Sequence, residues 1–117
     1  MAAYEYDAVV TGDGRITSVV LYLEKIPNPP TYDPTITPIM LKAKTSSEKE
    51  YERKKIKLHV TGDLDYMIIV NAISGTSWTF TLTEKGSKKK VIELEDQETG
   101  DGDYANKSIV TASVKPN

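Results

Sequence analysis

Residues Trp78-Thr79-Phe80-Thr81-Leu82-Thr83 alternate strictly between apolar and polar side chains. A period of two is typical of a β-strand with one buried face and one solvated face. The stretch Ile56-Lys57-Leu58-His59-Val60-Thr61 repeats this pattern. Neither stretch has the three- to four-residue spacing of an amphipathic helix. These two segments therefore predict an all-β protein.

Glycine-containing turns divide the rest of the chain into further expected strands. Two of these, Ile16–Leu23 and Leu64–Ile73, are apolar on both faces, which favours the interior of a sheet. Because glycine supplies the positive φ of tight turns, we expect Thr11–Gly14 to join Tyr4–Val10 to Arg15–Glu24 as a hairpin. The spacing of the turns predicts about eight strands. We expect one immunoglobulin-like, antiparallel two-sheet sandwich over residues 1–117.

The expected core consists of the apolar side chains on the inward faces of these strands. Its members are Val20, Tyr22, Ile56, Leu58, Val60, Ile68, Val70, Trp78, Phe80, Leu82, Ile92 and Leu94.

Two segments depart from the period of two. Ile26–Pro38 holds five of the six prolines, and proline cannot donate to a central ladder. This segment is therefore expected to be an extended loop or an edge. Thr45–Lys55 is nearly all polar, and Ser47 followed by Glu50 is a capping-box pattern. Either a single helical turn or an edge strand guarded by charge fits that segment.

The composition excludes several classes of protein. The 117 residues include 15 Lys and Arg and 17 Asp and Glu, a net charge of -2, which opposes nucleic-acid binding driven by bulk charge. There is no Cys and a single His, so disulfide, thiol and His-rich metal chemistry are excluded. No signal-peptide pattern follows Met1, and no apolar run is long enough for a membrane helix. We expect a cytoplasmic protein as written, or a leaderless or mature secreted one.

Acidic residues gather near the end of the chain. Six carboxylates lie within the eleven residues from Glu93 to Asp103. Calcium prefers six to eight oxygen ligands from a loop that can wrap around it. A solvated hairpin loop is the alternative interpretation. The candidate ligands for calcium are Glu95, Asp96, Asp101, Asp103 and Asn106.

The same stretch resembles the calcium loop of bacterial fucose-binding lectins. The resemblance rests on Glu95-Asp96, Asp101-Gly102-Asp103-Tyr104 and Ile109-Val110. In that family the sugar hydroxyls coordinate calcium directly, so the resemblance implies a calcium-dependent sugar site. Ala105-Asn106-Lys107 departs from the further Asn-Asp pair of the family. That departure leaves room for one ion at most.

A longer segment, from about Asn28 to Pro116, is similar to fungal immunomodulatory proteins. These are small Cys-free, lectin-like proteins with an immunoglobulin-like sandwich. They open with a dimerisation helix, whereas this chain opens with a hairpin pattern. The similarity rests on Asn28-Pro29, Thr35-Ile36-Thr37-Pro38, Tyr51, Arg53, Val60, Gly62, Gly86-Ser87, Val91, Leu94-Glu95, Gly100, Gly102, Ala105 and Ile109. Both resemblances imply a sugar-binding protein without enzymatic activity.

Tyr32 in the proline-rich segment and Tyr104 in the acidic segment are the candidate ligand-binding aromatics. A tyrosine offers an apolar face and a hydroxyl to a sugar or a protein partner, although either ring could instead anchor its loop. We predict a non-enzymatic carbohydrate-binding module that forms a homodimer. The alternative is a protein-interaction or structural domain that docks through the proline-rich loop or an edge strand.

Overall fold

A computed structural model describes residues 4–23, 38–58, 62–100 and 106–115. Within these ranges the chain forms strands and turns, with no helix and hence no helix that could cross a membrane. The strands are β1 (Tyr4–Gly12), β2 (Ile16–Leu23), β3 (Ile39–Ala43), β4 (Glu50–Leu58), β5 (Leu64–Ala72), β6 (Ser77–Glu84), β7 (Lys90–Glu98) and β8 (Lys107–Val114).

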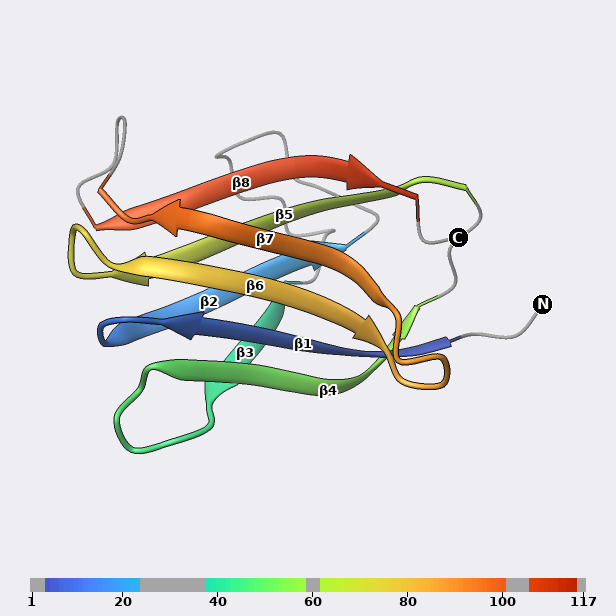
Figure 1. Ribbon diagram of the computed structural model, residues 1–117, viewed down its shortest axis with the longest axis horizontal. Helices are drawn as coiled ribbons and strands as arrows, with labels where there is room; N and C mark the ends of the chain where they lie inside the picture. Colours follow the sequence, from blue (N-terminus) through green and yellow to red (C-terminus); the bar gives the residue numbers. More distant parts are fainter. Residues whose placement is uncertain (1–3, 24–37, 59–61, 101–105, 116–117) are drawn as a thin grey trace.

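The strands form one continuous antiparallel sheet in the order β7-β6-β1-β4-β3-β2-β5-β8. The short strand β3 pairs with β4 on one side and with β2 on the other, and so connects the two halves. The sheet curls until its end strands, β7 and β8, lie side by side (Figure 1). The all-β prediction and the number of strands are confirmed. The sheet is nearly barrel-shaped and does not separate clearly into two sheets.

The prediction of a hairpin at Thr11–Gly14 is wrong. β1 pairs with β4 and β6, whereas β2 pairs with β3 and β5. The backbone amides of the turn form hydrogen bonds with other segments of the chain. Gly12 N donates to Lys49 O at 2.8 Å, and Asp13 N donates to Ser77 O at 2.9 Å. The turn is therefore a corner that carries the chain from one half of the sheet to the other.

The core fills the interior of the curled sheet. Of the expected core residues, eight are buried: Ile56, Leu58, Ile68, Val70, Trp78, Phe80, Leu82 and Ile92. Leu94 is half-buried and packs against them. Val60 lies outside the described residues.

Val20 and Tyr22 were expected in the core, and this prediction is wrong. Both are only half-buried, and the buried residues of β2 are Ile16, Val19 and Leu21. The pairing of β2 with β5 shifts by one residue between Ile16 and Ser18, and this bulge changes which residues face inward. Because the strand is apolar on both faces, its pattern did not indicate the inward face.

The polar segment Thr45–Lys55 contributes to a turn and to the first part of β4. β4 lies between β1 and β3, so it is neither an edge strand nor a helical turn. The proline-rich segment Ile26–Pro38 lies outside the described residues except for Pro38.

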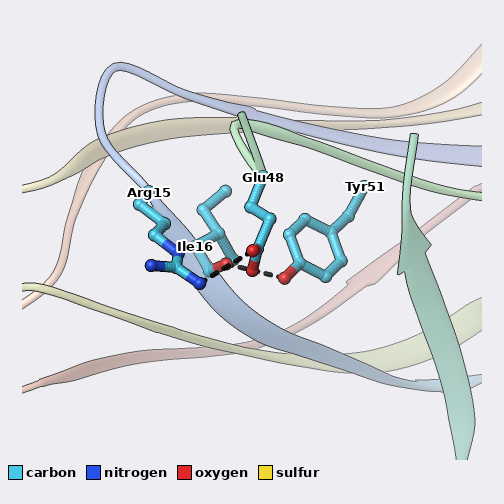
Figure 2. Close-up of polar contacts among 4 residues, drawn as sticks. All are labelled: Arg15, Ile16, Glu48 and Tyr51. Carbon is cyan, nitrogen blue, oxygen red and sulfur yellow. Dashed lines mark hydrogen bonds and ion pairs between the residues drawn. The ribbon is translucent and has the colours of Figure 1, made fainter. Parts of the chain in front are cut away.

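A buried tyrosine ties β4 to the corner that follows β1. The Tyr51 hydroxyl donates a 2.6 Å hydrogen bond to the Ile16 carbonyl. Figure 2 shows the Glu48 carboxylate between this ring and Arg15, whose Nη2 donates to Glu48 Oε1 at 2.8 Å. Ile16 N in turn donates to Glu48 O at 2.8 Å. Burial, and secondarily the negative charge of Glu48, raises the pKa of Tyr51 above its usual 10.0.

Tyr51→Phe should lower the free energy of unfolding by about 1–3 kcal/mol, because it leaves the buried Ile16 carbonyl without its donor. A urea titration measures this loss. Tyr22→Phe is the matched control, since the Tyr22 hydroxyl has no partner among the described residues. A loss in the control equal to that in Tyr51→Phe would contradict the assignment.

The raised pKa also predicts a pH dependence. A phenol that holds its proton more tightly in the folded state stabilises the fold fully below the unfolded pKa, near 10.0. That contribution is lost as the pH rises through the folded pKa. The wild-type protein should therefore lose stability above pH 10, and Tyr51→Phe should lose less. Urea titrations at pH 8 and pH 11 make the comparison, and equal losses would contradict it.

Two bulges place non-glycine residues in the left-handed region. Lys54 and Lys55 together face Asp7 on β1, and Lys55 has a φ of 59°. Glu95 and Asp96 together face Thr79 on β6, and Asp96 has a φ of 58°. Such a φ costs a residue with a Cβ roughly 1–2 kcal/mol.

Lys55→Gly should therefore raise the free energy of unfolding by up to about 1 kcal/mol, because glycine adopts this φ without strain. The substitution keeps the 3.2 Å hydrogen bond that the backbone N–H at Lys55 donates to Asp7 Oδ1. Lys57→Gly, at an exposed position of the same strand that lacks a positive φ, should instead destabilise the protein. Thermal unfolding of both variants tests the pair, and equal shifts would show that the bulge is not strained.

Candidate functional site

A hollow of about 550 Å³ opens on the outer face of the sheet, where β1 ends, β6 begins and β7 ends. Its lining consists of Thr11, Gly12, Asp13, Ser77, Trp78, Thr79, Asp96 and Glu98. Ser77 and Thr79 lie on the outer face because they alternate with the buried Trp78. All the lining residues that carry a hydroxyl or a carboxylate are exposed.

The pairing of β6 with β1 and β7 aligns polar side chains in two rows across the hollow. Thr11 lies opposite Thr79, and the bulge places Asp96 next along that row. In the second row Ser77 lies opposite Glu98 on β7. The Asp13 carboxylate joins this row, because its Oδ1 accepts a 3.0 Å hydrogen bond from Ser77 N. The rows therefore combine hydroxyls and carboxylates that come from three separate strands.

Gly12 lines the hollow, and its lack of a side chain makes room for the buried Ile16 on the core side of the strand. A Cβ at this position would lie 3.0 Å from Ile16 Cδ1 and 3.3 Å from the Gly14 carbonyl oxygen. A larger residue would have to displace the corner between β1 and β2. The close approach of the Ile16 side chain and the Gly14 carbonyl explains why glycine stands here.

The hollow carries negative charge, since Asp13, Asp96 and Glu98 line it and no lysine, arginine or histidine does. Trp78 is 1% exposed, so its ring belongs to the core and offers no stacking face to a ligand. Its Nε1 is buried without a partner among the described residues. The wall of the hollow therefore offers hydrogen-bond acceptors and hydroxyls.

The structure brings one of the predicted site residues into this hollow. Asp96 lines it, whereas Glu95 lies beside Asp96 in the bulge and is not part of the lining. Asn106 precedes β8, where its carbonyl accepts a 3.0 Å hydrogen bond from Ala72 N. The other predicted site residues lie outside the described ranges: Tyr32, Asp101, Asp103 and Tyr104. Within the described ranges no three His, Cys, Asp or Glu residues are grouped to hold a metal ion.

Sequence reasoning missed five of the polar residues in the lining. Thr79 was assigned only to the outer face of its strand, and Asp13 only to a turn. A sequence signal for the site exists in the threonine alternation and in the Thr-Gly-Asp-Gly turn. Joining the two requires the β1–β6 pairing, which the sequence pattern does not provide. The missed residues are Thr11, Asp13, Ser77, Thr79 and Glu98.

A smaller hollow of about 360 Å³ lies over β3 and β4, lined by Lys42, Ala43, Glu52, Arg53 and Lys54. Its charges are of both signs, and Lys44 Nζ nearby lies 3.7 Å from Glu50 Oε1 and 4.0 Å from Glu52 Oε1. Exposed pairs of this kind contribute little to stability. This hollow is a solvated charged surface.

Comparisons of the chain with protein-family models, with curated proteins and with solved structures gave no match.

Proposed function

We propose that this protein is a non-enzymatic carbohydrate-binding module and that the hollow between β1, β6 and β7 holds the sugar. The observation that carries the proposal is the lining, which combines three carboxylates with three hydroxyls. Sugar hydroxyls both donate and accept hydrogen bonds, and ionised carboxylates are strong acceptors for them. The volume, about 550 Å³, lies in the usual range for small-ligand pockets, roughly 300–1,000 Å³.

The two polar rows suit a ring that carries several hydroxyls. Along a strand the rows are two residues apart, or roughly 7 Å, and neighbouring strands are about 4.8 Å apart. A saccharide laid across them could therefore satisfy acceptors from more than one strand at once. A hydrogen bond to a charged group contributes about 1.5–3 kcal/mol. Two or three such bonds would give the weak affinity typical of a single sugar site, roughly millimolar to micromolar.

We propose binding of the sugar without catalysis. Acceptors spread over an open face hold hydroxyl groups without activating a leaving group. We further propose kinship with the immunoglobulin-like fungal immunomodulatory proteins. The all-β antiparallel architecture and the absence of cysteine support that kinship.

A glycan array should show saturable binding, and titration calorimetry with the best ligand should give its affinity. Asp96→Asn should weaken this affinity about tenfold, which is 1.4 kcal/mol, because it replaces a charged acceptor with a neutral one. Asparagine also tolerates the positive φ at this position. Glu52→Gln in the smaller hollow is the matched control and should bind as the wild type does. The absence of saturable binding on the array, or equal affinities for Asp96→Asn and wild type, would contradict the proposal.

Calcium is a separate part of the proposal, with Glu95, Asp96, Asp101, Asp103 and Asn106 as its ligands. At a hundredfold excess over the dissociation constant, bound calcium would stabilise the fold by about 2.7 kcal/mol. The melting temperature should rise by roughly 4–8 °C for each kcal/mol, and a chelator should reverse the rise. Magnesium should substitute poorly because it requires tight octahedral geometry.

Asp101→Asn should abolish the calcium-dependent rise in melting temperature and leave the fold intact. Asp65→Asn, an exposed carboxylate on β5, is the control and should keep the rise. If the melting curves with and without calcium coincide, calcium is no cofactor. The sugar hollow is still tested separately by calorimetry in the presence of chelator.

A further inference from the structure

The two ends of the sheet meet without joining. β7 and β8 lie side by side, as Figure 1 shows, yet they are the terminal strands and share no ladder in the described residues. The backbone bond between them lies where the connection begins, from Gly100 N to Lys107 O at 3.3 Å. We call the strip between the two strands the β7–β8 seam. Within the described part of the chain, both strands therefore have an unpaired edge there.

The edge of β8 presents a regular row of backbone groups. The Asn106 carbonyl accepts from Ala72 N, and β8 pairs with β5 without a register shift. In an antiparallel strand the backbone groups of alternate residues point to the same side. Ile109, Thr111 and Ser113 therefore direct their N–H and C=O groups away from β5. Among the described residues these groups have no partner.

The two edges differ in their protection against strand addition. β7 has two register shifts against β6, including the bulge at Asp96, and it is rich in carboxylates. Bulges and charges of this kind prevent a new strand from pairing. β8 has no bulge, no proline and no charged residue between Lys107 and Lys115. Strand addition is therefore open at β8 and hindered at β7.

The core is incompletely covered along the seam. Leu94 on β7 and Val110 and Val114 on β8 pack against the core but are only half-buried. Ala112 points to the same side of β8 as Val110 and is exposed. Apolar side chains packed over these residues would be removed from water. Their burial would stabilise the complex by roughly 25 cal/mol for each Å² of apolar surface.

The β7 border of the seam is acidic. Glu93, Glu95, Asp96 and Glu98 are all exposed there, against one lysine, Lys90, at the start of the strand. A segment lying in the seam would have one side chain of every two facing the core and the next facing outward beside these carboxylates. The outward side chains would be favoured if they carried positive charge.

We propose that the β7–β8 seam takes up an extended segment of a partner protein in which apolar and basic residues alternate. The segment pairs with β8 as a ninth strand through Ile109, Thr111 and Ser113. Its apolar side chains cover Leu94, Val110 and Ala112, and its lysines or arginines face Glu93 and Glu95. This is a protein-docking surface distinct from the sugar hollow.

A second copy of this chain suits the seam less well. Its own β8 has no basic residue between Lys107 and Lys115 to face the carboxylates. Pairing of two β8 edges would also bring the acidic β7 strands of both copies toward one another. The charge pattern therefore favours a basic peptide from a partner.

The probe is a fluorescently labelled seven-residue peptide of alternating lysine and valine, titrated with the full chain and followed by anisotropy. Binding should saturate, and an alternating glutamate and valine peptide should not bind. Thr111→Pro should weaken binding at least tenfold, since it removes an outward N–H that β5 does not use. Thr111→Ala is the matched control and should bind as the wild type does. Glu93→Gln with Glu95→Gln should weaken binding as well.

The Thr111→Pro result decides between pairing and simple charge attraction. If Thr111→Pro binds like the wild type while the glutamine variant binds weakly, strand pairing is overturned. Amide exchange of the wild type provides the second measurement in case Thr111→Pro does not fold. The peptide should protect the amides of Ile109, Thr111 and Ser113, and unchanged exchange at all three would overturn the proposal.

Light scattering tests whether a second copy of this chain occupies the β7–β8 seam instead of a partner peptide. A wild-type mass of twice 13.0 kDa, reduced to one chain by Thr111→Pro, would overturn the partner peptide in favour of self-pairing. A single-chain mass for both proteins, together with saturable peptide binding, supports the proposal.

Discussion

The hydrogen bond from the Tyr51 hydroxyl to the Ile16 carbonyl joins two parts of the chain on which the rest of the sheet depends. It ties β4, which pairs with β1, to the first residue of β2, which pairs with β3 and β5. The corner between β1 and β2 is therefore fixed by a side chain from a third strand. Because the chain passes from one half of the sheet to the other at this corner, the position of β2 against β4 is held by a contact buried in the core. The Arg15–Glu48 pair shields the polar side of the same contact.

The sequence predicts the strands well because a half-buried strand must alternate. Trp78, Phe80 and Leu82 are buried as their spacing indicates. The same reasoning failed at Val20 and Tyr22, where both faces are apolar and a bulge reverses the inward face. It failed again at Thr11–Gly14, because glycine permits a tight turn without specifying whether the flanking strands pair. Local chemistry thus determines strand and turn, while pairing depends on distant contacts.

Less of the candidate site could be predicted, and the reason is the same. Asp96 stands out in an acidic run, so its charge is visible in the sequence. Asp13 and Glu98 are 85 positions apart in the numbering and share a hollow only because β1 and β7 both flank β6. No spacing rule connects such residues. A site made from side chains across several strands becomes visible only when the order of the strands is known.

The place of β1 in the sheet has a consequence for folding. β1 is the first strand in the chain, yet its two neighbours are β4 and β6, so its outer partner ends only at Glu84. Sheets built from such distant pairings fold slowly, because long loops must close before the contacts form. During synthesis, β1 can pair with β4 once Leu58 has left the ribosome, but its other edge stays unpaired until β6 follows. The nascent protein therefore depends on a slow late step, in which unpaired strands are open to aggregation and to binding by chaperones.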